Sequence, residues 1–233
     1  MSRKHIFLVL IILISFIILL KEVFMVPSLL GREDKEIVAL PEVKRMEDGS
    51  LSDLMYKRRS IRSFAQGEMT LEQVSKLLFA AQGITRHDRF RTVPSAGALY
   101  PLEVFIVTGS VSNLADGIYK YRSKTHQLIQ VCVGDKRDDL ARECLGQMWI
   151  SKAQVVLVIC GVYERVTQKY GQRGVRYVDI EAGCSAQNVS LEGFNLGLGS
   201  TVVGAFNDKG VSEMINADKK ERPIIVMPVG LIP

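Results

Sequence analysis

The sequence AQVVLVICGV at residues 153–162 decides the fold class of this chain. The run is almost wholly apolar and rich in the β-branched residues Val and Ile. A strand with one face in water alternates apolar and polar residues, whereas a strand covered on both faces is a continuous apolar run. We therefore expect residues 153–162 to form a central strand of a sheet with a layer on each side.

Shorter β-rich runs occur before and after this central strand. Two of them flank the polar turn Arg122–His126 and predict a hairpin. The others stand alone and predict single strands of the same sheet. The expected strands, in chain order, are Glu103–Thr108, Gly117–Tyr121, Leu128–Val133, Ser200–Phe206 and Pro223–Val229.

Helical patterns lie between these strands. Thr70 and Gln73 form a capping box, and the apolar positions that follow predict a helix that ends at Gly83. Residues at three- and four-residue spacing, without a proline, predict a long helix over Val175–Leu198. These residues are Ile180, Cys184, Gln187, Leu191, Phe194 and Leu198. Shorter helices are expected over Asp135–Gly146 and Lys209–Asn216. Because strands and helices do not alternate as in a Rossmann domain, we expect an α+β sandwich.

The beginning of the chain differs in composition from the rest. Residues Ile6–Leu20 are apolar except for Ser15. Although this run is shorter than the roughly 20 residues that cross a bilayer, Lys21 can snorkel and the apolar stretch resumes after it. An uncleaved anchor is favoured over a secretory signal because no small-x-small pattern follows, and basic residues on both flanks leave the sidedness open. We expect a membrane anchor at 1–26, a charged linker at 27–49 and one domain at 50–233.

Composition and charge exclude several classes of protein. The net charge of +5 is spread along the chain, and no block of Lys and Arg is interleaved with aromatic residues, so nucleic-acid binding is not expected. The cysteines are widely spaced and none forms a C-x-x-C pair, which argues against a zinc site and a disulfide framework. We therefore expect neither a metal nor a nucleic-acid partner.

A basic cluster, RRSIR at residues 58–62, is the first candidate for ligand binding. Arg58, Arg59 and Arg62 offer planar donor forks that pair with phosphate oxygens. Ser60 can donate to the same anion or to a ribityl hydroxyl. A solvated surface or an ion-pair network would have the same composition. The cluster alone therefore indicates an anion site without deciding it.

The second candidate is the loop PSAGALYP at residues 94–101, just before an expected strand. Prolines at both ends fix this loop. Its small residues allow the backbone amides to approach a flat ligand closely, where larger side chains would prevent contact. An ordinary turn at the start of the strand is the simpler alternative. The residues that would meet a ligand are Pro94, Ser95, Ala96 and Gly97.

Polar residues are concentrated again at residues 169–177, KYGQRGVRY. Lys169 and Tyr170 are candidate proton donors, because desolvation can tune both side chains toward acid–base work. A surface charge and a packed ring are the alternative. The region therefore carries the candidate catalytic residues of the chain.

The long helix that follows carries three polar residues and one cysteine of interest. Glu181, Gln187 and Asn188 need partners if they are buried, which indicates structural hydrogen bonds. A mechanism through the Cys184 thiol is disfavoured, because no histidine is placed beside it to act as a base. The helix is therefore expected to be structural.

Taken in order, these motifs resemble the nitroreductase superfamily over about Ser50–Gly230. The residues that carry the resemblance are RRSxR at 58–62, PSAGxxYP at 94–101, YGxRGxRY at 170–177, QN at 187–188, LGLG at 196–199 and VGAF at 203–206. More narrowly, they resemble the branch of the thiazoline and oxazoline dehydrogenases. The resemblance implies an α+β fold whose central, mostly antiparallel sheet is flanked by helices.

The resemblance also implies FMN in a groove between the two subunits of a homodimer. The first cluster, Arg58, Arg59, Ser60 and Arg62, would hold the phosphate, the ribityl chain and the pyrimidine edge. The loop Pro94–Gly97 of the partner subunit would cover the flavin. The stretch Val203, Gly204 and Ala205 would allow the backbone to approach the flavin ring.

The implied function is hydride transfer in two steps through bound FMN. NAD(P)H would reduce a nitro or quinone acceptor, or an azoline ring would be oxidised to an azole. Two departures favour the alternative of a membrane-tethered flavin- or ligand-binding module without turnover. Cys184 stands where family members often have a histidine, and no basic residue follows Gly230, where many nitroreductases have one that completes the phosphate site.

Overall fold

The computed structural model describes residues 49–86 and 90–233. The anchor predicted at residues 1–26, and the linker up to residue 48, lie outside the described residues. Within the described ranges, no helix combines the length and the hydropathy needed to cross a membrane.

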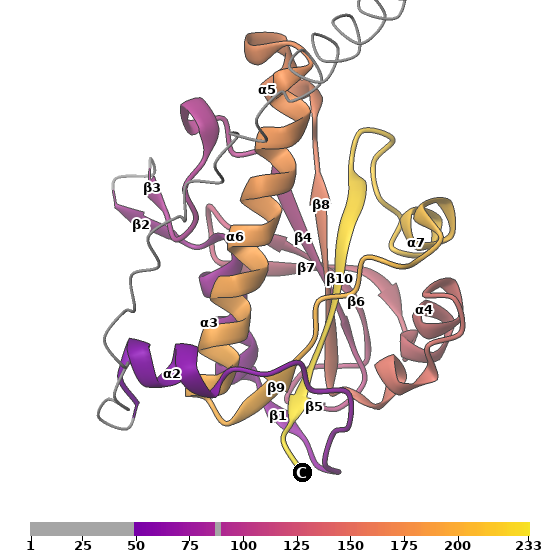
Figure 1. Cartoon of the computed structure of the whole chain (residues 1–233). Helices are drawn as coiled ribbons and strands as arrows, with labels where there is room; N and C mark the ends of the chain where they lie inside the picture. The colour runs from indigo at the N-terminus through magenta and orange to yellow at the C-terminus, as the bar shows by residue number, and fades with distance from the viewer. Residues whose placement is uncertain (1–48, 87–89) are drawn as a thin grey trace, which may run out of the picture. The chain divides into compact units, whose positions relative to one another are not determined.

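A six-stranded sheet forms the centre of the fold (Figure 1), with the strand order β7-β6-β4-β8-β10-β9. Every neighbouring pair in it is antiparallel. The strands are β4 (Leu102–Thr108), β6 (Gly117–Arg122), β7 (Gln127–Val133), β8 (Val155–Gly161), β9 (Leu198–Ser200) and β10 (Arg222–Leu231). The predicted α+β class with a mostly antiparallel sheet is therefore confirmed.

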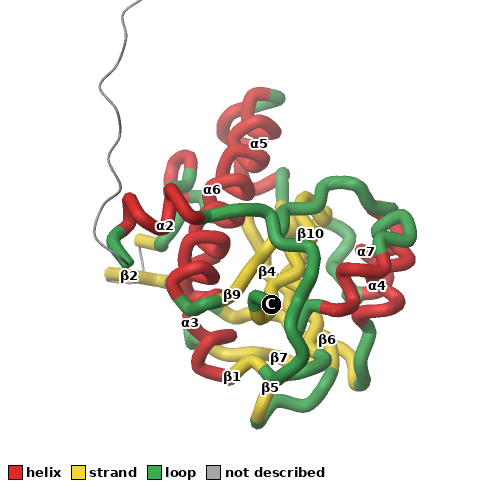
Figure 2. The backbone as a smooth tube through the Cα atoms, turned by 60° about the horizontal axis from the view of Figure 1, so that its bottom comes forward, coloured by secondary structure: helices red, strands yellow, loops and turns green. Residues whose placement is uncertain are grey.

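Helices cover both faces of this sheet, as the tube in Figure 2 also shows. The helices are α2 (Leu51–Lys57), α3 (Leu71–Gln82), α4 (Arg137–Glu143), α5 (Glu164–Tyr170), α6 (Arg173–Asn195) and α7 (Asp208–Met214). Short 3-10 turns lie at Ala96–Ala98 and Met148–Lys152. Two small strand pairs complete the fold: parallel β1 (Met69–Thr70) with β5 (Val111–Ser112), and antiparallel β2 (Ile84–Arg86) with β3 (Phe90–Arg91).

Strand β8 is the central strand that the apolar run at 153–162 predicts. It pairs with β4 on one side and β10 on the other, and each of its residues is buried. Its side chains alternate between two cores. Val155, Leu157 and Ile159 pack in the core that contains α3 and α6. The intervening residues, Val156 and Val158 among them, pack in the core that contains α4 and α7. The lack of polar alternation thus reflects two covered faces.

Three predicted elements have different bounds in the structure. The strand expected over Ser200–Phe206 is wrong over most of its length, since β9 ends at Ser200 and only an isolated bridge joins Val203 to Val226. The helix expected to reach Gly146 ends at Glu143, before the left-handed Leu145 (φ 57). The long helix runs over Arg173–Asn195, so it begins two residues earlier than expected and ends before Leu198, which lies in β9. Of the helices, α5 was not expected at all.

The predicted stripe of α6 lies on its partly exposed side: Cys184, Leu191 and Phe194 are half-buried, and Leu198 is buried in β9. Ile180 is 57% exposed and Gln187 is also exposed. The buried side of α6 is made mainly of small residues, which allow close packing on α3 and the sheet. They are Gly174, Val178, Glu181, Ala182, Ser185, Ala186, Val189, Ser190 and Gly193. A partly apolar helix face is therefore left uncovered by the rest of the described chain.

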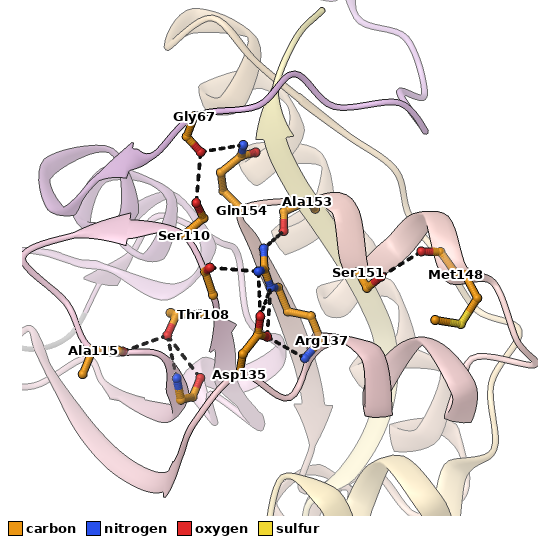
Figure 3. A network of polar contacts seen from close by, with 12 residues as sticks. Gly67, Thr108, Ser110, Ala115, Asp135, Arg137, Met148, Ser151, Ala153 and Gln154 are labelled. Carbon is orange, nitrogen blue, oxygen red and sulfur yellow. Dashed lines mark hydrogen bonds and ion pairs between the residues drawn. The ribbon is translucent and has the colours of Figure 1, made fainter.

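A guanidinium group ties the loops at one end of the sheet together (Figure 3). Arg137 donates from Nη1 to the Ala153 carbonyl oxygen (2.7 Å) and from Nη2 to the Gly109 carbonyl oxygen (2.8 Å). Its Nη2 also pairs with the Asp135 carboxylate at 2.7 Å. The side chain thus joins the end of β4, the start of β8 and the turn before α4.

We expect Arg137→Ala to lower the free energy of unfolding by about 2–4 kcal/mol, because two carbonyls lose a charged donor and Asp135 loses its partner. Urea denaturation followed by circular dichroism measures this. Arg142→Ala is the matched control, since the Arg142 side chain is exposed and its ion-pair partner in the described ranges is Asp139 at the surface. The control should change stability by less than about 0.5 kcal/mol. Equal losses in the two variants would contradict a structural role for the Arg137 network.

Candidate functional site

The Arg58–Arg62 segment follows α2 and runs beside the short edge strand β9. The Ile61 amide donates to the Ser200 carbonyl oxygen at 3.0 Å, and Thr201 Oγ1 donates to the Ile61 carbonyl oxygen. The approach is close because residue 199 is glycine: a Cβ on Gly199 would lie 2.7 Å from side-chain atoms of Ile61. The backbone of this segment is therefore fixed against the sheet.

The side chains of the segment differ in what they are free to bind. Arg59 Nη1 donates to the carbonyl oxygens of Tyr56 and Arg58, each at 2.8 Å, so its guanidinium is engaged locally. Ser60 and Arg62 are exposed, and the Arg62 guanidinium lies 5.7 Å from the centre of the Trp149 ring. Among the described residues, no carboxylate forms an ion pair with Arg58 or Arg62. Their charge is available to an anion.

Residues 203–205 lie on the same surface as the Arg58–Arg62 segment. Val203 exchanges both backbone hydrogen bonds with Val226 (2.9 and 3.0 Å), which fixes the stretch beside β10. Gln147, two residues before Trp149, donates to the Ala205 carbonyl oxygen at 3.1 Å. A Cβ on Gly204 would meet no atom of the described chain within 4 Å. The structure thus brings the first predicted cluster and residues 203–205 together, with open space over Gly204.

The Pro94–Gly97 loop has the fixed shape that its sequence predicts. Ser95 Oγ accepts from the Tyr100 amide at 2.9 Å, and the Ala98 amide donates to the Ser95 carbonyl oxygen at 3.1 Å. Three residues in and after the loop are left-handed: Gly97 (φ 63), Ala98 (φ 54) and Tyr100 (φ 46). Such a backbone is strained for residues with a side chain and is found where the surrounding structure enforces it.

Lys169 and Tyr170 converge on this loop from the last turn of α5. A Cβ on Gly97 would lie 2.8 Å from Tyr170 Oη and 3.1 Å from Lys169 Nζ. The Tyr170 ring packs edge-on against Tyr177, with 5.3 Å between the ring centres. The structure therefore places both candidate proton donors at one residue of the predicted flavin cover.

Glu181 lies close to the same loop but is fully inside the protein. It is 2% exposed, and neither carboxylate oxygen has a hydrogen-bond partner in the described structure. Burial raises the pKa of this carboxyl to about 7. Ser95 favours the charged form, as do Arg91 and Gln82 more weakly, but burial outweighs them. The structural hydrogen bonds expected for Glu181 are therefore not found.

The other polar positions on α6 have simpler roles. Asn188 Nδ2 donates to the carbonyl oxygens of Thr92 (3.0 Å) and Ala80 (3.3 Å), which confirms the expected structural hydrogen bonds. His126 bonds Ser75 (2.7 Å) and Tyr121 (2.8 Å) through its two ring nitrogens, so it is not a base for Cys184. Within the part of the chain that the structure describes, no cluster of His, Cys, Asp and Glu could hold a metal ion.

The predicted site residues fall into two groups at opposite ends of α6 (Figure 1). The Pro94–Gly97 loop, Lys169 and Tyr170 lie towards the end where α6 begins, and the Arg58–Arg62 segment lies beside β9, which follows the last residue of α6. Helix α6 has 23 residues. At a rise of about 1.5 Å per residue it is roughly 34 Å long. Ser95 of the loop lies beside Glu181, and the helix from Glu181 to Asn195 is about 21 Å long, so the two groups of one chain are well apart along α6.

Comparison with known proteins identifies the family. The profile of the family described as "Nitroreductase family" matches residues 55–231. The chain belongs to the nitroreductase family. The predicted nitroreductase-like fold is thereby confirmed, and the chain is an oxidoreductase of this family.

Individual relatives support the same assignment. One relative is the protein MJ1384 of Methanocaldococcus jannaschii, which is named as a nitroreductase. It is 42% identical over 193 residues, which cover 83% of this chain and 95% of that protein. The microcin B17-processing protein McbC of Escherichia coli is 28% identical over 213 residues, or 85% of this chain and 76% of McbC. A solved structure of the E. coli microcin synthetase McbBCD complex with truncated pro-MccB17 bound matches with a TM-score of 0.66 at 28% identity, covering 86% of this chain and 79% of that chain. The resemblance to the azoline-dehydrogenase branch of the nitroreductase family is thus confirmed.

Proposed function

We propose that this nitroreductase-family chain is an FMN-dependent oxidoreductase that works as a homodimer. Each flavin site would combine the Arg58–Arg62 segment and residues 203–205 of one chain with the Pro94–Gly97 loop, Lys169 and Tyr170 of the other. The observation that carries this proposal is the separation of the two groups along α6, from Glu181 beside Ser95 to the end of the helix at Asn195. A second copy related by a twofold axis would bring opposite ends of the two chains together.

The residues of the first group fit the chemical groups of FMN. Arg58 and Arg62 have no carboxylate partner in the described chain, and a phosphate dianion is the ligand that such guanidinium groups pair with most strongly. Ser60 is exposed beside them. The open space over Gly204 would admit a flat ring against the backbone. These features support FMN over a non-planar or cationic ligand.

The uncovered apolar surface supports the dimer. Ile180 on the outward face of α6 is 57% exposed, and Tyr56 on α2 is 59% exposed. Leu51, Met55 and Phe90 are large apolar residues that are also more than half exposed. Apolar surface of this extent is typical of a surface that another protein covers. A second copy of the chain would bury the α6 face and complete both flavin sites.

FMN, when bound, would supply hydride acceptance and donation. The chain would supply the phosphate site and the proton donors Lys169 and Tyr170. The substrates would be a nitro or quinone acceptor with NAD(P)H, or an azoline ring that is oxidised to an azole. We further propose that residues 1–26 anchor the protein in a membrane, which would place the two anchors of a dimer in one bilayer.

Complementation between two variants tests the site and the dimer together. One chain carries Arg58→Ala and Arg62→Ala, and a differently tagged chain carries Gly97→Val, whose Cβ meets Tyr170. Each homodimer should lose its flavin. The co-expressed heterodimer should hold about half of the wild-type FMN, because one of its two sites has only wild-type residues. Flavin absorbance of the tandem-purified full chains in detergent measures this, and circular dichroism checks folding.

Three outcomes of this experiment would contradict the proposal. Homodimers that keep their flavin would show that neither group binds it. A heterodimer without flavin would show that both groups act within one chain. FMN that binds normally but is never reduced by NADH, NADPH or a test substrate would favour the binding module without turnover.

A further inference from the structure

A cavity of about 560 Å³ lies beside Leu99 and Tyr100, directly after the Pro94–Gly97 loop. Its volume is within the range of about 300–1,000 Å³ that is usual for small-molecule sites. Among the described residues, Glu103 is the one carboxylate that lines it. Five basic side chains line it as well: Arg91, Lys120, Arg122, Lys124 and Arg165. We call this cavity the basic pocket.

Two of the five cations are neutralised by the protein. Lys120 forms ion pairs with Glu221 and, at 3.6 Å, with Glu103. Arg165 pairs with Glu103 at 2.6 Å and donates to the Tyr100 carbonyl oxygen at 2.9 Å. Glu103 and Glu221 therefore compensate Lys120 and Arg165, and they leave the other three cations of the basic pocket.

Arg91 donates hydrogen bonds to neutral groups, although the nearby carboxylates Glu103 and Glu181 also favour its charge. Its Nη1 donates to Gln82 Oε1 (2.8 Å) and Ser123 Oγ (3.0 Å), and its guanidinium lies 4.7 Å from the centre of the Tyr100 ring. Burial lowers the pKa of Arg91, which reflects the cost of its desolvated charge. Burial raises the pKa of the nearby Glu181 carboxyl, which weakens its compensation of the Arg91 charge. Arg91 is thus a fixed positive charge that an anion would stabilise.

Arg122 is the last residue of β6, and Lys124 lies in the turn between β6 and β7 at the same cavity. Neither side chain has an ion pair within the described ranges. On an open surface, two cations in and next to a turn would simply be solvated by water. Here the cations line a cavity together with the half-buried Arg91, and apolar side chains such as Val104 and Ile129 form part of its wall. A ligand with an anionic group and a less polar body fits this lining.

We propose that the basic pocket binds the phosphate monoester group of a small-molecule ligand through Arg91, Arg122 and Lys124. Guanidinium and ammonium groups at one concave site favour phosphate, which offers three oxygens and a charge near −2. The volume exceeds what a phosphate alone needs and leaves room for a nucleoside. If the proposed hydride-transfer function holds, on which this assignment rests, the ligand is the 2′-phosphate end of NADPH. A phosphorylated substrate is the other source of the same group.

Direct binding is the first test. Isothermal titration of the full chain with adenosine 2′-monophosphate should give saturable binding, with adenosine at least tenfold weaker. Arg122→Ala/Lys124→Ala should weaken binding of the nucleotide by about tenfold or more, because its phosphate loses two cationic hydrogen-bond donors. The matched control, Lys209→Ala/Lys219→Ala, removes the same charge at and near α7 and should leave binding unchanged. Equal affinity for nucleotide and adenosine, or equal effects of the two double variants, would overturn the proposal.

A second measurement identifies the source of the phosphate. In flavin-loaded protein, the ratio of kcat/KM for NADPH to that for NADH should fall about tenfold in Arg122→Ala/Lys124→Ala, with FMN content unchanged. A ratio that stays constant while nucleotide binding weakens would assign the phosphate to a substrate. Protein without FMN that still binds adenosine 2′-monophosphate would overturn the proposed function and leave the phosphate site standing. FMN-containing protein that does not bind the nucleotide would overturn the site alone.

Discussion

Tyr170→Phe is expected to leave FMN bound and to lower kcat by about 10²–10⁴-fold, the range typical of a lost general acid or base. The Tyr170 hydroxyl and Lys169 Nζ converge on Gly97, in the loop that we propose covers the flavin of the partner chain. Removing the hydroxyl keeps the ring and its packing on Tyr177, so the site should assemble normally. Steady-state kinetics with flavin absorbance measures both quantities on one sample.

Tyr177→Phe is the matched control for this variant. The two rings are in edge-to-face contact. The atoms nearest to a Cβ on Gly97, however, belong to Tyr170 and Lys169 and not to Tyr177. The control should keep its turnover within about threefold, because a tenfold change in rate requires a change of about 1.4 kcal/mol in the activation free energy. Lys169→Met should lower kcat in the same direction as Tyr170→Phe, with a changed pH profile of kcat. Full turnover in both Tyr170→Phe and Lys169→Met would remove these residues from the chemistry.

Glu181→Gln is expected to gain stability over the wild type as the pH rises. Burial raises the pKa of Glu181 from its ordinary value of 4.5 to about 7. The folded state then binds more protons than the unfolded state between these values, so wild-type stability falls as the pH rises through this window. A shift of this size corresponds to about 3–4 kcal/mol once the carboxyl is ionised in both states, at about 1.4 kcal/mol per pKa unit. The glutamine does not ionise and escapes this loss.

Urea denaturation of both proteins between pH 4.5 and 8 measures this effect. The difference in unfolding free energy should move in favour of Glu181→Gln as the pH rises, and should level off once the wild-type carboxyl is fully ionised. Glu72→Gln is the control, because Glu72 is an exposed carboxylate paired with Lys76 and its pKa is lowered. The control should not drift in the same direction. If the unfolding free energies of wild type and Glu181→Gln change with pH in parallel, the pKa of Glu181 is not raised by burial.

The sequence predicts best what depends on neighbouring residues. The capping box of Thr70 and Gln73 is present with both reciprocal bonds, and α3 ends before Gly83 as expected. Strand β8 follows from its apolar composition alone. The outward stripe of α6 is also visible in sequence as a helical period, but the period cannot tell which side is buried. Small residues that pack tightly form the buried side instead.

What the sequence does not predict depends on contacts between distant residues. Helix α5 is short, has no side-chain cap at Tyr163 and ends at the left-handed Gly171 (φ 57), so no local signal separates it from the start of α6. The basic pocket gathers Arg91 from β3, Arg122 from β6 and Arg165 from α5, which are distant in sequence and meet only through tertiary contacts. The Arg58–Arg62 segment is recognisable as a motif, but its attachment to β9 through Ser200 is not.

The length of α6 also bears on how the protein would become active. Under the proposed arrangement a single chain carries two incomplete halves and no complete flavin site. Cofactor capture would then depend on the square of the chain concentration at low expression, and dilution would release flavin as the pair dissociates. A chain held in a membrane meets partners in two dimensions, where encounter is confined. Anchoring, pairing and loading with flavin would in that case be successive steps of one maturation process, each requiring the one before.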